Sequence, residues 1–90
     1  MPKDDVPPEF FEAVNKFIDL ANKMSKKWET SRVSSVIMYA AARYNAFNFV
    51  SLDPDPAKNS RQATDFYCEQ YRAMLVENMD YLISSRRADG

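Results

Sequence analysis

The sequence contains no histidine, one cysteine, Cys68, and one glycine, Gly90, which is the last residue. Without histidine the chain lacks the usual side chain for proton transfer near neutral pH and a common metal ligand. Without an internal glycine it has neither a glycine-rich phosphate-binding loop nor a dinucleotide-binding fingerprint. A lone cysteine cannot close an intramolecular disulfide. We therefore expect no enzyme, no metal site and no cofactor.

Long apolar runs and a strong net charge are also missing. The longest apolar run, residues 36–42, is far shorter than the roughly 20 residues that a membrane span requires. The 12 Lys and Arg residues against 13 Asp and Glu residues give a net charge of −1, which is not the basic footprint of a nucleic-acid-binding domain. The charged, proline-rich segment 1–8 lacks the apolar core of a secretory signal. These features predict a cytoplasmic protein that binds neither nucleic acid nor a membrane.

The residues that are present suffice for one small folded domain. The chain has 90 residues, of which 46% are hydrophobic, 13% aromatic and 28% charged. This balance is typical of a soluble globular protein and leaves no room for a second hydrophobic core. We expect a single helical domain over residues 1–90.

All five prolines lie at the start of the chain or in one short segment, and both proline-free blocks have helical periodicity. An amphipathic helix is predicted over about residues 8–28, with its apolar stripe at Phe10, Val14, Phe17, Ala21, Met24 and Trp28. From Val33 onward the apolar residues fall out of phase with this stripe. A second helix is therefore expected over about residues 32–51, capped by Thr30 or Ser31.

The prolines at positions 54 and 56 predict a stiff connector over residues 52–58, because each proline fixes its own φ and restricts the residue before it. Asn59 or Ser60 would then cap a longer third helix over about residues 60–86. The main apolar stripe of this helix is Tyr67, Tyr71, Met74, Leu75, Asn78 and Leu82. The predicted fold class is all-α, a three-helix antiparallel bundle that dimerisation completes.

The second helix is apolar on two opposite sides. One side carries Val33, Val36, Ile37, Ala40, Tyr44 and Phe47, and the other carries Met38, Ala42, Ala46 and Phe49. In a three-helix bundle each helix keeps one outward side, and an exposed apolar patch on a small protein usually marks an interface. We therefore expect the second set to form a homodimer interface with two-fold symmetry.

Polar residues that lie among or beside these apolar sides allow two interpretations. The residues are Arg43, Asn45, Asn48 and Asn78. As a core network, they would satisfy one another and fix the packing register of the helices. As a ligand site, they would line a pocket between helices together with apolar side chains.

The remaining candidate clusters are interpreted as structural. Asp53 and Asp55 have the spacing that begins a calcium loop, but the required glycine and closing glutamate are missing. Cys68 has no histidine to activate it. Carboxylate pairs on the third helix lack the histidines of a di-metal bundle site; they are Asp65 with Glu69 and Glu77 with Asp80.

One basic cluster has an aromatic neighbour. Lys23, Lys26 and Lys27 precede Trp28. On a continuous helix the lysines lie on the polar side and Trp28 on the apolar side, so the expectation is a solvated face with Trp28 as a core anchor. This geometry argues against a nucleic-acid contact.

Three segments carry a resemblance to a known family: FFEAVNKFIDLAN at residues 10–22, MYAAARYNAF at residues 38–47 and EQYRAMLVENMDYL at residues 69–82. In this order they resemble a small family of all-α proteins of about ninety residues, known mainly from proteobacterial genomes as a domain of unknown function. The resemblance covers about residues 9–84. It implies an all-α fold and a bacterial, cytosolic origin, and it assigns no active-site residue.

The sequence thus leaves the biochemical function unknown. The first hypothesis is a small interaction or structural protein that forms a homodimer through its second helix. The alternative is a small-molecule binding module whose pocket lies between helices and is lined by apolar, asparagine and arginine side chains.

Overall fold

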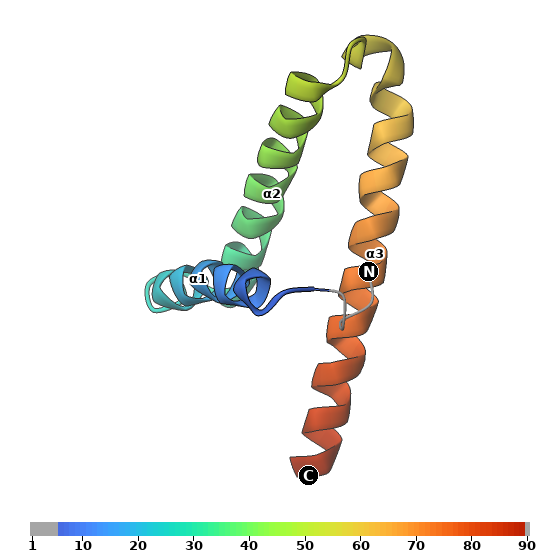
Figure 1. Ribbon diagram of the computed structural model, residues 1–90. Helices are drawn as coiled ribbons and strands as arrows, with labels where there is room; N and C mark the ends of the chain where they lie inside the picture. The colour runs from blue at the N-terminus through green and yellow to red at the C-terminus, as the bar shows by residue number, and fades with distance from the viewer. Residues whose placement is uncertain (1–5, 90) are drawn as a thin grey trace. The chain divides into compact units, whose positions relative to one another are not determined.

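The computed structural model describes residues 6–89, so segment 1–5, on which part of the expectation about a signal depends, lies outside it. The described residues form three α-helices and no strand: α1 is Pro8–Met24, α2 is Thr30–Leu52 and α3 is Pro56–Asp89 (Figure 1). The all-α class and the long third helix, with 34 residues, are confirmed. Two compact units divide the chain between Ala46 and Phe47, within α2. The single domain stays a prediction.

The helix α1 begins as expected and ends early. Pro8 occupies its first turn, where no backbone donor is needed, and the acidic Glu9 lies near the positive end of the helix dipole. The helix ends at Met24 instead of about Trp28. Both the backbone N–H and the hydroxyl of Ser25 donate to the carbonyl of Ala21, at 2.9 and 3.0 Å. Ser35 and Thr64 bond back in the same way inside α2 and α3, so this bond accompanies the end of α1 and does not cause it.

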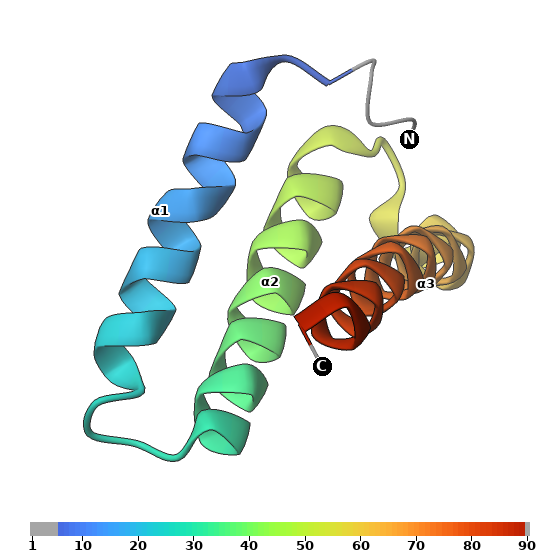
Figure 2. The ribbon, with the colours of Figure 1, turned by 90° about the horizontal axis from the view of Figure 1, so that it is seen from below.

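The turn after α1 produces the best-protected residue of the first unit. The carbonyl of Glu29 accepts bonds from the N–H groups of Arg32 and Val33, so α2 begins at Thr30 and the expected cap at Thr30 or Ser31 is wrong. Figure 2 shows that the turn brings the end of α1 next to the beginning of α2. Val33 is 3% exposed and is the one buried residue among those whose burial the structure describes. This turn therefore holds the core of the unit.

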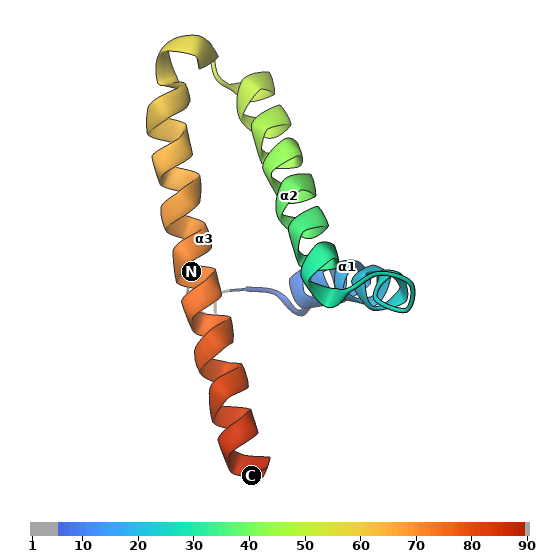
Figure 3. The ribbon, with the colours of Figure 1, turned by 180° about the vertical axis from the view of Figure 1, so that it is seen from behind.

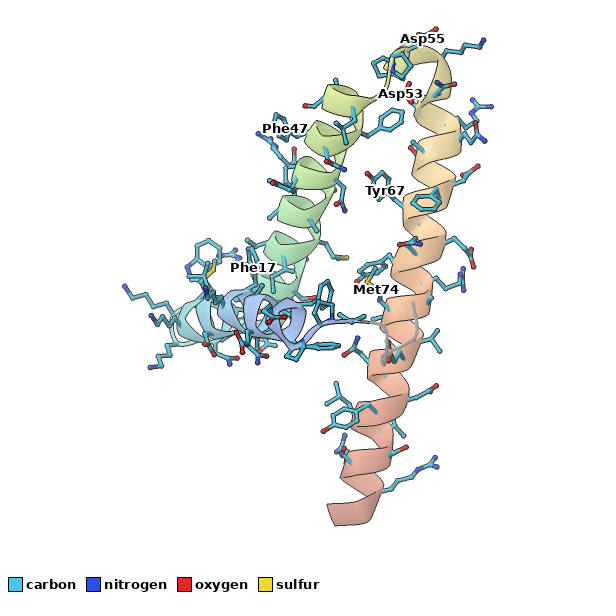
Figure 4. All side chains as sticks on the ribbon, in the orientation of Figure 1. Phe17, Phe47, Asp53, Asp55, Tyr67 and Met74 are labelled. Carbon is cyan, nitrogen blue, oxygen red and sulfur yellow. The ribbon has the colours of Figure 1, made fainter. Side chains whose placement is uncertain are left out.

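In the second unit, a hydrogen-bonded connector joins the end of α2 to α3. The carboxylate oxygen Oδ2 of Asp53 accepts from the backbone N–H of Asp55 at 3.0 Å and from the side-chain amide of Asn59 at 2.9 Å (Figure 4). An aspartate that binds the backbone two residues ahead forms a compact turn. Pro56 then starts α3 four positions before the expected residue 60. Asn59 and Ser60 lie inside the helix, so the cap predicted at one of them is wrong.

The connector joins the end of α2 to the beginning of α3 (Figure 3). The amide of Asn48 donates to the hydroxyl of Tyr67 at 3.4 Å. The half-buried residues of this part of α3 recur every three or four positions, as they do when one side of a helix is covered. These residues are Pro56, Asn59, Ala63 and Tyr67.

The Asp53 turn gives a first testable prediction. The substitution Asp53→Ala removes both hydrogen bonds and should lower the free energy of unfolding by about 1–2 kcal/mol, measured by urea unfolding of the full chain. The control is Lys58→Ala, an exposed residue in the first turn of α3, whose effect should stay within about 0.5 kcal/mol. Equal stability of the two variants would show that the Asp53 bonds do not hold the connector.

Candidate functional site

The candidate site is the surface of α2, because apolar residues surround this helix. Apolar residues lie on opposite sides of the helix, yet only Val33 is buried. A helix that is apolar all round normally has partners on more than one side. The apolar side chains that α2 leaves exposed include Ile37, Met38, Tyr39 and Val50.

The four residues expected at a dimer interface follow one another along one side of α2. The spacing of Met38, Ala42, Ala46 and Phe49 is four, four and three residues, which keeps them on one helical face. Met38 is 51% exposed, the two alanines are exposed and Phe49 is half-buried. Because Val33 lies on the opposite side of the helix, burial at the turn leaves this face accessible. Its role as an interface stays a prediction.

Three of the four polar residues expected in a network have a described hydrogen bond. The guanidinium of Arg43 donates to the hydroxyl of Tyr39 at 3.3 Å and lies 5.5 Å from the centre of that ring, a cation–π arrangement. The amide of Asn78 donates to the carbonyl of Met74 one turn earlier, at 2.8 Å.

All four of these polar residues are exposed. Asn48 bonds to Tyr67 across the second unit, as described above. Arg43, Asn48 and Asn78 each make a described hydrogen bond, and each has a different partner. Both interpretations of these residues, a core network and a pocket lining, stay predictions.

The early end of α1 changes the surroundings of Trp28. Lys27, Trp28, Glu29 and Arg32 line an open hollow of about 220 Å³. The guanidinium of Arg32 lies 5.2 Å from the centre of the indole ring, over its face. The expectation that Lys27 and Trp28 point apart assumed a continuous helix, and it is wrong because residues 25–29 form a turn. The hollow carries both signs of charge, since it is lined by the acidic Glu29 as well as by the basic Lys27 and Arg32.

Helical spacing does not predict this contact. Trp28 and Arg32 are four residues apart, but Trp28 lies in the turn before α2, so the two residues are not on successive turns of one helix. The interpretation of Asp53 and Asp55 as a structural turn agrees with the bond from the backbone N–H of Asp55 to the carboxylate of Asp53, whereas the second bond, from the amide of Asn59, was not predicted.

The other chemistry-bearing residues are dispersed. Cys68 is exposed and has no disulfide partner within the described chain. Over residues 6–89, no three or more histidine, cysteine, aspartate or glutamate side chains gather closely enough to hold a metal ion. Within the same residues, no helix is both long and apolar enough to cross a membrane.

The three helices of residues 6–89 and the accessible apolar surface of α2 define a small all-helical protein. The family described as "Protein of unknown function (DUF3144)" matches residues 10–83, and the chain belongs to this family. The resemblance drawn from its three sequence segments is thereby confirmed. No curated protein and no solved structure matches the sequence.

Proposed function

We propose that the protein acts by contact, as a small cytoplasmic homodimer, and not by catalysis. In this proposal the three helices pack as an antiparallel bundle, and the face of α2 formed by Met38, Ala42, Ala46 and Phe49 joins two copies. The observation that carries the proposal is the apolar character of α2 on opposite sides, of which the side with Val33 is buried at the turn. The other side is then left for a partner.

The composition of this face favours a second helix as its partner. Ala42 and Ala46 are one turn apart, and their small side chains allow two helix backbones to approach closely. Met38 and Phe49 stand at the two ends of the pair of alanines and supply the large apolar side chains that anchor an interface. Two-fold symmetry would place the same face of each copy against the other.

The edges of the face carry polar groups that suit an interface rim. Arg43 extends along Tyr39, so its charge stays near solvent while its stem covers an aromatic ring. Asn45 is exposed on the other edge. A polar rim of this kind is typical of interfaces and limits unspecific association.

Sedimentation equilibrium of the full chain at micromolar concentration tests the proposal. We expect a mass of twice the chain mass of 10.4 kDa, with dissociation on dilution. A monomer at every concentration would refute self-association. A monomer that specific metabolites stabilise in a thermal-shift screen would instead support the small-molecule alternative.

A further inference from the structure

The second half of α3 carries an apolar stripe that is distinct from the stripe facing α2. The side of α3 toward α2 is marked by Asn59, Ala63 and Tyr67, which are half-buried. At 100° per residue, the stripe of Tyr71, Leu75 and Leu82 lies about a quarter of a turn away from that side. Tyr71 is 49% exposed, Leu75 39% and Leu82 62%. Within the second unit, this second stripe is therefore exposed to solvent.

The second stripe has the spacing of a coiled coil. Its members alternate three and four residues apart over two and a half heptads, which is the pattern of core positions in paired helices. The members are Cys68, Tyr71, Leu75, Asn78, Leu82 and Ser85. If heptads begin at positions 61, 68, 75 and 82, the positions four residues further on flank the stripe on one edge. They are Asp65, Arg72, Met79 and Arg86.

We propose that this half of α3 pairs antiparallel with the same half of a second copy, with Leu75 of each copy opposite Asn78 of the other. The proposal deepens the self-association proposed above and rests on it. In this register Tyr71 packs against Leu82 of the second copy, and Cys68 lies opposite Ser85. The pairing is symmetric, as a two-fold dimer requires.

The charges on the edge select this register. With Leu75 opposite Asn78, Asp65 and Arg86 of the second copy lie on the same edge, about 3 Å apart along the axis, and the pair occurs twice. If one copy is shifted by one heptad in one direction, Arg72 lies opposite Arg72 of the second copy. The opposite shift sets Arg72 against Arg86, so both alternatives bring like charges together.

A parallel pairing lacks this complementarity. In register, it sets Tyr81 beside Arg86 and Tyr67 beside Arg72, and no acid meets a base across the edge. It also aligns the two helix dipoles, which antiparallel helices oppose favourably. Parallel copies would place Cys68 opposite Cys68, a difference that a crosslinking experiment detects.

The test uses the single cysteine as a reporter. In the variant Ser85→Cys, the introduced thiol should lie opposite Cys68 of the second copy and join it when oxidised glutathione is added. Each disulfide forms from two thiols, which pass two electrons and two protons to one oxidised glutathione and yield two reduced glutathiones. The two thiols within one chain are about 26 Å apart along α3 and cannot join each other.

Ser84→Cys is the matched control, because the neighbouring position faces away from the stripe. On a non-reducing gel, covalent dimers of Ser85→Cys should form at least about tenfold faster than those of Ser84→Cys or of the unaltered chain. The reason is that the dimer holds Cys68 of one copy next to the introduced thiol of the other, which gives the two thiols a high effective concentration. Adding Cys68→Ser to Ser85→Cys should abolish the fast crosslink. Sedimentation equilibrium of each reduced variant is measured alongside.

The outcomes separate the two proposals. A non-covalent dimer in which Ser85→Cys and Ser84→Cys crosslink equally slowly refutes the α3 pairing and leaves the proposed dimer standing. Rapid crosslinking of the unaltered chain through Cys68 refutes the antiparallel arrangement in favour of a parallel one. A monomer under all conditions, with α3 covered by the rest of its own chain, refutes both proposals.

Discussion

Replacing Val33 with aspartate is expected to lower the free energy of unfolding by about 3 kcal/mol or more, a large part of the stability of a small protein. Val33 is 3% exposed next to the turn between α1 and α2. A carboxylate there loses most of its hydration, because the site is almost closed to solvent. The milder Val33→Ala should cost about 2 kcal/mol through lost contacts and a cavity.

The matched control is Ser34→Asp, which places the same charge one position along α2 on an exposed site. Near the beginning of the helix this charge lies close to the positive end of the dipole, so its effect should stay within about 0.5 kcal/mol. Urea unfolding followed by helical circular dichroism measures all three variants on the full chain. If Val33→Asp were as stable as Ser34→Asp, the turn would not be the core of the first unit.

Much of this helical architecture could be predicted from sequence because few local signals compete with it. The absence of internal glycine and the confinement of proline leave long stretches in which helix is the favoured local state. The boundaries were less predictable. Asp53 orders the connector through side-chain bonds to nearby groups, and such bonds depend on geometry that periodicity does not encode.

For the candidate site, the sequence predicts which residues share a helical face but not which partners the polar residues bind. Helical spacing identified the face of α2 with Met38 and Phe49, because position on a helix follows from sequence number alone. It did not identify the partners of the polar residues. Arg43 bonds to Tyr39, which depends on the rotamers of the two side chains. Asn48 bonds to Tyr67, which depends also on where α3 lies beside the end of α2.

Replacing Ala42 with glutamate should weaken the proposed dimer by at least about a hundredfold in its dissociation constant. Ala42 lies at the middle of the predicted interface, where a methyl group allows close approach of two helices. Two-fold symmetry would bring the two introduced carboxylates near each other, so each would be desolvated and repelled at once. Sedimentation equilibrium over a range of micromolar concentrations measures the change.

Ala41→Glu is the control for this substitution, because it has the same chemistry and the same helix propensity one residue away, on the edge between the two apolar sides of α2. It should leave the dissociation constant within about threefold of the original, as rim charges usually do. Helical circular dichroism of both variants distinguishes dissociation from unfolding. If Ala42→Glu dimerised as well as Ala41→Glu while Ser85→Cys crosslinked rapidly, α3 and not α2 would join the two copies.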